Sequence, residues 1–88
     1  MPECSVVVPN REGLQTRNSA NLVKLANSFA CNIRISKDDE ECNAKSIMGV
    51  MLLAAEQGSV LKIFTDGIDA PSALSALVDL IESGFQPA

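Results

Sequence analysis

Two short segments carry side chains whose types and spacing are suited to chemistry. The first runs from Gly13 to Ser19 and places Gln15 and Arg17 near the expected start of a helix. The free N–H groups at a helix start favour anions, so a cation such as Arg17 runs against that preference. Its presence is explained if the guanidinium and the N–H groups hold a visiting anion such as phosphate. The alternative is a solvated arginine that binds nothing.

The second segment runs from Asn43 to Gly49, with Ser46 at the start of another expected helix. A serine there is ordinarily a plain N-cap. Phosphorylation would add about −1.5 to −2 charges at the positive end of the helix, where they are tolerated. A glycine inside a helix costs about 1 kcal/mol relative to alanine, which indicates that something packs closely there. Two interpretations remain open for the apolar residues of this helix, Ile47, Met48 and Met51. They form an outward patch that adapts to partners, or they are buried in the core.

No arrangement for covalent or acid–base catalysis is visible. The chain has no histidine, so its serines lack a base, and imidazole metal ligands and phosphohistidine are excluded. The carboxylates of residues 38–41 are expected in a solvated turn. The cysteines form no CxxC pair, and we expect Cys4 and Cys31 to be small buried hydrophobes. The sequence therefore predicts neither an enzyme nor a metal or cofactor site.

The length limits the number of domains, and the composition limits the classes of partner. Eighty-eight residues allow one domain, which we expect to span residues 1–88. A net charge of −4 argues against binding a nucleic-acid backbone, and 3% aromatic residues leave no platform for stacked bases. No apolar run is long enough for a signal or a membrane span, and three scattered cysteines fit a reducing compartment. We expect a soluble, cytoplasmic protein.

Hydrophobic periodicity predicts the elements that position the two segments. Alternation over residues 3–8 indicates a strand, and a helix is expected from an N-cap at Thr16 to about Asn27. Alternation over residues 31–36 indicates a second strand, which an acidic turn joins to a short third strand at residues 41–43. The apolar stripe of the first helix comprises Leu22, Leu25, Ala26 and Phe29.

The second half of the chain predicts two more helices around one strand. The short helix that starts at Ser46 is expected to end with Gly58 as a left-handed cap. Residues 60–65 indicate a central strand buried on much of both faces. Asp69 is expected to cap the last helix, and Gly84 to end it with an apolar contact behind. The order β-α-β-β-α-β-α favours an α+β sandwich, an antiparallel sheet covered on one face.

At the two segments the chain resembles the histidine-containing phosphocarrier (HPr) family of the sugar phosphotransferase system. The family's first signature, an Asn and then Gly-Leu-His-Ala-Arg-Pro-Ala, corresponds to Asn10 and Gly-Leu-Gln-Thr-Arg-Asn-Ser at residues 13–19. The second, Asn-Ala-Lys-Ser-Ile-Met-Gly, is intact at residues 43–49, and residues 57–58, 66–70 and 83–85 also fit. The resemblance covers essentially the whole chain. It implies an open-faced sandwich of four antiparallel strands covered by three helices.

The resemblance also implies that phosphocarrier activity is lost. In the family, the histidine accepts a phosphoryl group from enzyme I and passes it to sugar-specific components. Its place is taken by Gln15, whose delocalised amide nitrogen is not a useful nucleophile. Arg17, which helps to hold the phosphoryl group in the family, is retained. Asn18 and Ser19 replace the usual proline and alanine.

The pattern is similar to the Crh-like members of the family, regulators that also have glutamine in place of the histidine. This resemblance implies that an ATP-dependent HPr kinase/phosphorylase phosphorylates Ser46. The phosphoprotein would then bind a catabolite-control transcription regulator, with contacts from Arg17, Ile47, Met48 and Met51. The alternative is a module that docks on phosphotransferase components or regulators without phosphorylation, with Ser46 as a plain cap.

Overall fold

The computed structural model describes residues 3–85, which fold as β-α-β-β-α-β-α, as the sequence predicts. The strands are β1 Glu3–Val7, β2 Asn32–Lys37, β3 Glu40–Asn43 and β4 Val60–Asp66. The helices are α1 Thr16–Asn27, α2 Ile47–Leu52 and α3 Ala70–Glu82. Within this part of the chain, no helix has the length and apolarity needed to span a bilayer.

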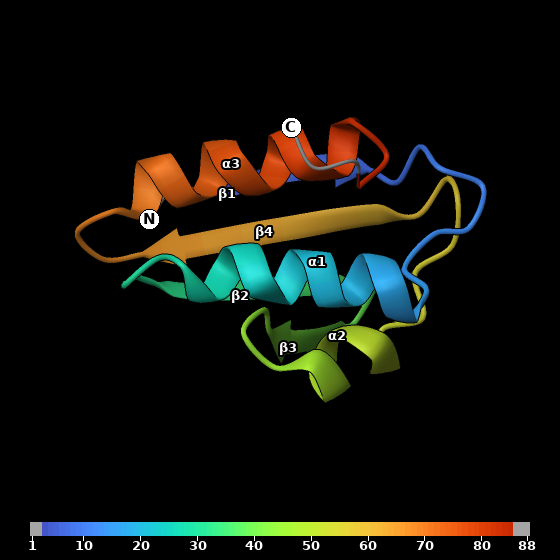
Figure 1. Ribbon diagram of the computed structural model, residues 1–88, viewed down its shortest axis with the longest axis horizontal. Coiled ribbons are helices and arrows are strands. Elements are labelled where there is room, and N and C mark those ends of the chain that lie inside the picture. Colours follow the sequence, from blue (N-terminus) through green and yellow to red (C-terminus); the bar gives the residue numbers. More distant parts are fainter. Residues whose placement is uncertain (1–2, 86–88) are drawn as a thin grey trace.

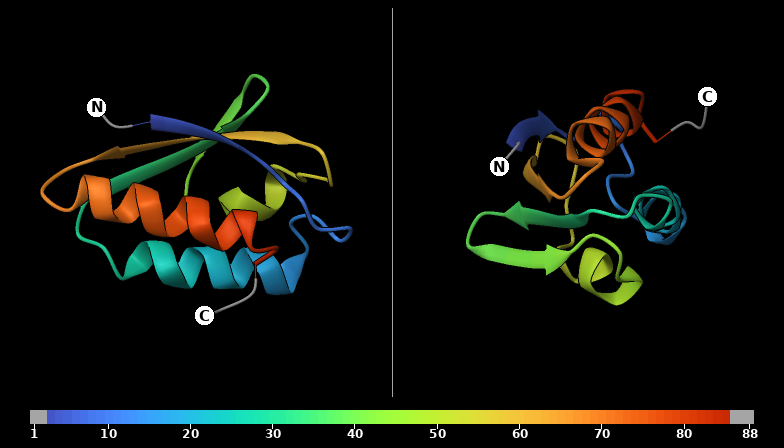
Figure 2. Two further views of the ribbon diagram at one scale, coloured as in Figure 1. Left: turned by 90° about the horizontal axis from the view of Figure 1, so that it is seen from above. Right: turned by 90° about the vertical axis from the view of Figure 1, so that its left-hand side faces the viewer.

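The strands form one antiparallel sheet in the order β1-β4-β2-β3. All three helices lie on the same side of this sheet and leave its other face open (Figures 1 and 2). One cross-strand row shows the inward side: Ile63 lies opposite both Cys4 and Ile35, and Ile35 lies opposite Cys42. The α+β open-faced sandwich expected from the sequence is therefore confirmed.

The predicted burial of β4 on both faces is wrong. Leu61, Ile63 and Thr65 are buried, whereas Val60 is 54% exposed and Lys62 is also exposed. Although β4 is an interior strand, helices cover only one face of the sheet, so alternate side chains remain in solvent.

The cysteines differ in burial. Cys31 is buried as expected, but Cys4, near the start of the edge strand β1, is only half-buried. Burial raises the pKa of the Cys31 thiol, and the neighbouring Asp69 carboxylate adds to the shift. In the part of the chain that the structure describes, no cluster of acidic or cysteine side chains is placed to hold a metal ion.

Two helix boundaries differ from the predicted ones. The N-cap of α1 is Gln15 rather than Thr16, because the N–H of Ser19 already donates to the Gln15 carbonyl at 2.8 Å. Helix α2 ends at Leu52, so Gly58 does not cap it; Gly58 lies in the later turn before β4. The left-handed residue that follows α2 is Ala54, which has a φ of 49°.

The end of α3 follows the prediction. Gly84 has a φ of 76°, and the Phe85 N–H donates to the Leu80 carbonyl at 2.8 Å. Phe85 is buried, so the apolar contact expected behind the glycine is confirmed.

Asp69 is the N-cap residue of α3, but its side chain makes no cap hydrogen bond. Its carboxylate instead accepts hydrogen bonds from the Ala30 and Cys31 N–H groups, each at 2.8 Å. These bonds lower the pKa of the Asp69 carboxyl. A β-carbon at Gly67 would lie 2.8 Å from the Cys31 β-carbon, so a glycine allows this close approach. Asp69 therefore joins the α1–β2 connection to the start of α3.

The first prediction concerns the pH dependence of Asp69→Asn. The folded-state pKa of the Asp69 carboxyl is depressed, so the carboxylate stabilises the fold at pH values above its unfolded-state pKa of about 3.9. This stabilisation is lost as the pH falls through the folded-state pKa. At pH 7 the variant should have a lower urea midpoint of unfolding than the unaltered protein. The gap between the two midpoints should narrow below about pH 4. Asp79→Asn, at an exposed position of α3, is the control. An equal gap at pH 7 and at about pH 3 would contradict the assignment.

Candidate functional site

A close backbone contact brings the start of α1 to the segment that follows α2. The Leu14 N–H donates to the Ala55 carbonyl at 2.9 Å. Gly13 has a φ of 63°, and a β-carbon there would overlap the Ala55 oxygen and lie 3.0 Å from the Glu56 α-carbon. A glycine is required at this position. The contact sets Gln15 and Arg17 at the end of the molecule where α2 finishes.

The loop between β1 and α1 is fixed by further bonds. The Val8 N–H donates to the Ser59 carbonyl, and the Gly58 N–H donates to the Val8 carbonyl, both at 2.9 Å. The Gln57 amide donates to the Pro9 carbonyl at 3.0 Å. The Asn10 amide donates to the Gly13 carbonyl at 3.0 Å. These contacts hold the loop in one position.

Two of the four residues that depart from the family signature, Asn18 and Ser19, bond the same loop. The Asn18 amide donates to the Gly13 carbonyl at 2.8 Å, and the Ser19 hydroxyl to the Leu14 carbonyl at 3.3 Å. Ser19 is buried, whereas Gln15 and Arg17 are exposed. Local hydrogen bonding thus accounts for these two substitutions, whereas the side chains of Gln15, Thr16 and Arg17 are exposed.

An exposed carboxylate lies beside this loop at Glu12. Its pKa is lowered by its own backbone N–H and by the Asn10 amide, with a smaller contribution from the charge of Arg11. The loop surface before Gln15 therefore carries charges of both signs.

Ser46 is the N-cap of α2 and is exposed. Its hydroxyl accepts a hydrogen bond from the Gly49 N–H at 3.3 Å, and its own N–H donates to the Asn43 carbonyl at 3.0 Å. The Asn43 side chain in turn accepts from the Lys45 N–H at 2.9 Å. The hydroxyl is therefore both a cap and a group that solvent and partners can reach.

Two side-chain hydrogen bonds with the C-terminal end of α1 and the residues just after it fix the segment before Ser46. The Asn27 amide donates to the Lys45 carbonyl at 3.2 Å, and the Lys45 ammonium donates to the Phe29 carbonyl at 2.7 Å. Sequence reasoning missed these roles of Asn27 and Lys45. The partners lie 18 and 16 residues apart, so no local pattern indicates them.

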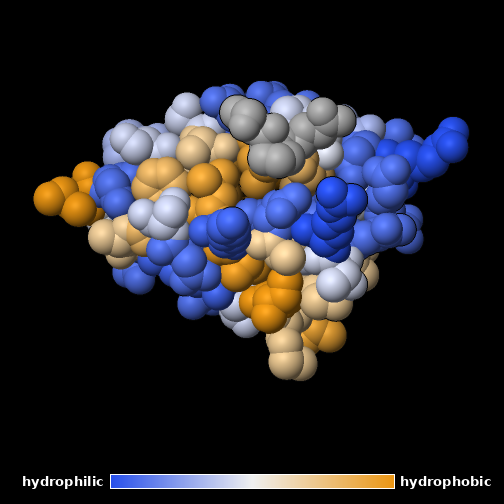
Figure 3. All heavy atoms as spheres, viewed as in Figure 1, coloured by the Kyte–Doolittle hydropathy of each residue, from blue (hydrophilic) through white to orange (hydrophobic). Residues whose placement is uncertain are grey.

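The exposed apolar side chains of α2 decide between the two interpretations left open by periodicity. Met48 is 70% exposed, Met51 41% and Ile47 37%, and in α2 only Val50 is buried. Leu52, which the sequence analysis did not select, is 75% exposed. We call these four exposed residues the α2 patch: Ile47, Met48, Met51 and Leu52. Figure 3 shows apolar atoms over α2 at the lower edge of the molecule.

The glycine within α2 packs as the sequence predicts. A β-carbon at Gly49 would lie 3.1 Å from the Cys42 β-carbon on β3. The inner side of the helix thus rests closely on the sheet, and the α2 patch lies on its outer side.

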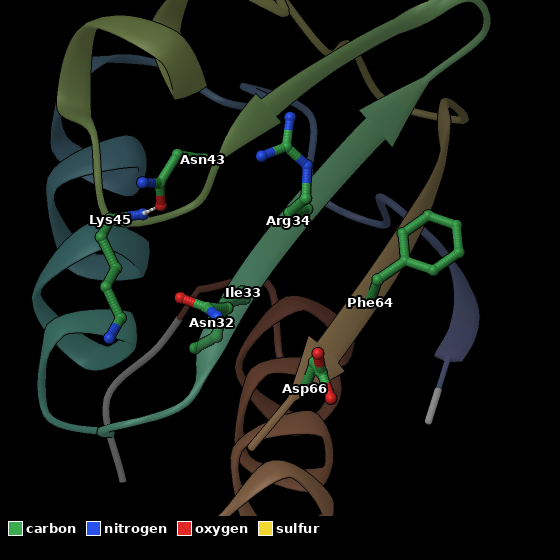
Figure 4. Close-up of a pocket in the computed structure, with 7 residues that line it drawn as sticks. All are labelled: Asn32, Ile33, Arg34, Asn43, Lys45, Phe64 and Asp66. Carbon is green, nitrogen blue, oxygen red and sulfur yellow. Dashed lines mark hydrogen bonds between the residues drawn. The ribbon is translucent and has the colours of Figure 1, made fainter. Parts of the chain in front are cut away.

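A hollow on the open face of the sheet lies away from the α2 patch and shares Asn43 and Lys45 with the segment before Ser46. It is lined by Asn32, Ile33, Arg34, Asn43, Lys45, Phe64 and Asp66 (Figure 4). Arg34 lies opposite Phe64 on the next strand and forms an ion pair with Glu41. Both cations of the hollow are engaged within the chain, because Lys45 donates to Phe29. We therefore assign no function to it.

Comparisons with known proteins identify the family. Residues 2–83 match the family model described as the PTS HPr component phosphorylation site. The chain is 46% identical to phosphocarrier protein HPr of Xylella fastidiosa over 85 residues, 97% of this chain and 96% of that protein. It is 45% identical to HPr-like protein Crh of Halalkalibacterium halodurans over 82 residues, 93% of this chain and 98% of that protein.

Solved structures agree. The crystal structure of HPr-C-His from Thermoanaerobacter tengcongensis is similar with a TM-score of 0.94 at 43% identity, over 100% of this chain and 99% of that one. Crh of Bacillus subtilis, described as a swapped dimer, is similar with a TM-score of 0.77 at 34% identity, over 99% of this chain and 100% of that one. The chain belongs to the HPr family of phosphocarrier proteins of the phosphotransferase system. Overall identity does not separate its HPr relatives from its Crh relatives, so the choice between them depends on individual residues.

The second prediction tests the cap. Ser46→Ala removes the acceptor of the Gly49 N–H and should lower the free energy of unfolding by about 1 kcal/mol. Ser46→Asn keeps a good N-cap and should lose less than half as much. Urea denaturation monitored by circular dichroism measures both. Equal losses in the two variants would show that the cap bond is not what stabilises α2.

Proposed function

We propose that the chain is a non-catalytic regulatory member of the HPr family, unable to carry phosphohistidine and switched by phosphorylation at Ser46. The observation that carries the proposal is Gln15, the N-cap of α1, at the position where the resemblance places the phosphoryl-accepting histidine. An amide nitrogen delocalised into its carbonyl does not attack phosphorus. Arg17 remains exposed in the first turn and is free to contact a partner instead.

The switch at Ser46 is supported by where its hydroxyl lies. It is exposed at the start of α2 and immediately precedes the apolar side chains of Ile47 and Met48. Phosphorylation would add charge and three strong acceptor oxygens beside an apolar surface that the protein already presents. An HPr kinase/phosphorylase is the proposed modifying enzyme, and a catabolite-control transcription regulator the proposed partner. The Crh relative of Bacillus subtilis, at 34% identity, is described as a catabolite repression protein, which supports a partner in catabolite control.

The proposed contact surface combines the two segments. Met48 and Met51 supply flexible, polarizable side chains that adapt to a partner, and Ile47 adds apolar area. Arg17 supplies a cation from the start of α1, which the Leu14–Ala55 bond holds beside the end of α2. Apolar contacts would provide most of the affinity and the charges most of the selectivity.

One observation favours a second candidate function. The Ser46 hydroxyl already has a structural role as acceptor of the Gly49 N–H. If that is its whole role, the chain is a binding module that docks on phosphotransferase components or regulators through the α2 patch without phosphorylation. Ser46→Ala would then leave partner affinity unchanged.

The third prediction separates these functions by intact mass. The chain is incubated with phosphoenolpyruvate and enzyme I, and in parallel with ATP and an HPr kinase/phosphorylase. One added phosphoryl group is expected in the ATP reaction only and should be absent in Ser46→Ala, because Ser46 is the acceptor and Gln15 is no nucleophile.

Phosphocarrier protein HPr of Xylella fastidiosa serves as the control that enzyme I is active. Transfer to the chain in the phosphoenolpyruvate reaction would overturn the loss of phosphocarrier function. No mass change in either reaction would favour the binding module over the switch.

A further inference from the structure

The α2 patch ends beside an acidic turn. Leu52, with Leu53 and Ala54, forms one side of a hollow whose other side is the β2–β3 turn. The turn contributes the exposed carboxylates of Asp38 and Asp39, and the adjoining first residue of β3 contributes that of Glu40; we call these three residues the acidic turn. An exposed leucine and three carboxylates therefore share one continuous surface.

Lys37 joins the turn to the end of α2. Its ammonium donates to the Leu53 carbonyl at 3.2 Å and to the Ala54 carbonyl at 3.3 Å. These carbonyls directly follow the C-terminus of α2, where a cation is in a favourable position, so Lys37 is engaged there. One engaged cation against three exposed carboxylates leaves the rim of the hollow negative.

We propose that the α2 patch and the acidic turn form one docking surface for a partner segment that combines an apolar face with basic side chains. Lysine or arginine of the partner would lie against Asp39 and Glu40 at the Leu52 end, while its apolar face covers Met48 and Leu52. The inference deepens the proposed function, since it rests on the α2 patch as the docking surface, but it does not depend on phosphorylation.

A phosphate on Ser46, at the start of α2, would add charge of the same sign as the acidic turn. A six-residue helix is about 9 Å long, close to the screening distance of about 8–10 Å at physiological salt. A phosphate on Ser46 and the carboxylates of the turn would therefore both act on a partner that covers α2. Phosphorylation would strengthen a preference for basic partners that the unmodified chain already has.

The test uses two synthetic amphipathic helical peptides with the same leucine face, one with lysines and one with glutamates at the polar positions. Each is titrated into the unphosphorylated protein and followed by amide NMR. The lysine peptide should shift the amides of residues 38–40 and 47–54 and bind more tightly than the glutamate peptide.

Variants locate the effect. Asp39→Asn/Glu40→Gln should weaken the lysine peptide about fivefold in low salt, and this loss should vanish in about 0.5 M salt. The matched control, Asp79→Asn/Glu82→Gln, removes two exposed carboxylates from α3, on the opposite side of the molecule (Figure 1), and should change affinity less than about twofold. Met48→Ala/Leu52→Ala should weaken both peptides.

Two results would overturn the inference, and they differ in what else they affect. Equal binding of both peptides at α2, unchanged in Asp39→Asn/Glu40→Gln, would remove the acidic turn from the docking surface and leave the α2 patch in place. Shifts confined to other elements, unaffected by Met48→Ala/Leu52→Ala, would overturn the α2 patch and the proposed function with it.

Discussion

Between the Gly13 backbone and the Ala55 carbonyl there is no room for a side chain, and the geometry of the candidate site depends on this contact. The Leu14 N–H completes it by donating to the same carbonyl. Through it, the turn that starts α1 is attached to the chain just after α2. Gln15 and the α2 patch, which are more than thirty residues apart in sequence, are thereby held at one end of the molecule.

Helix α2 is too short to be stable by itself, since isolated helices of fewer than about 12 residues are marginal in water. Only Val50 is buried within it, so its own packing contributes little. The structure fixes both ends instead, through Asn27 and Lys45 before Ser46 and through Lys37 after Leu52. The helix is thus held so that its apolar side chains remain in solvent. Exposed apolar surface of this kind is typical of an interaction site.

Periodicity predicted the order of the elements because each core-facing side chain repeats with the period of its own helix or strand. It failed for β4, since Val60 is apolar whether or not a second layer covers it. The N-cap position of Asp69 was predicted correctly, but the hydrogen-bond partners of its side chain lie 38 and 39 residues away, so no local pattern indicates them. Gln15, Arg17 and Ser46 could be selected because they lie in recognisable motifs. Leu52 and Lys37 could not, since only the folded chain brings the end of α2 to the β2–β3 turn.

In the proposed function, charge at Ser46 changes what the α2 patch binds. The most direct measurement is the affinity of a catabolite-control transcription regulator for the Ser46-phosphorylated and the unmodified chain, by isothermal titration calorimetry. We expect phosphorylation to tighten binding at least about tenfold, and the phosphorylated Met48→Ala variant to lose most of that gain. Equal affinities of the phosphorylated and unmodified chains would contradict the claim.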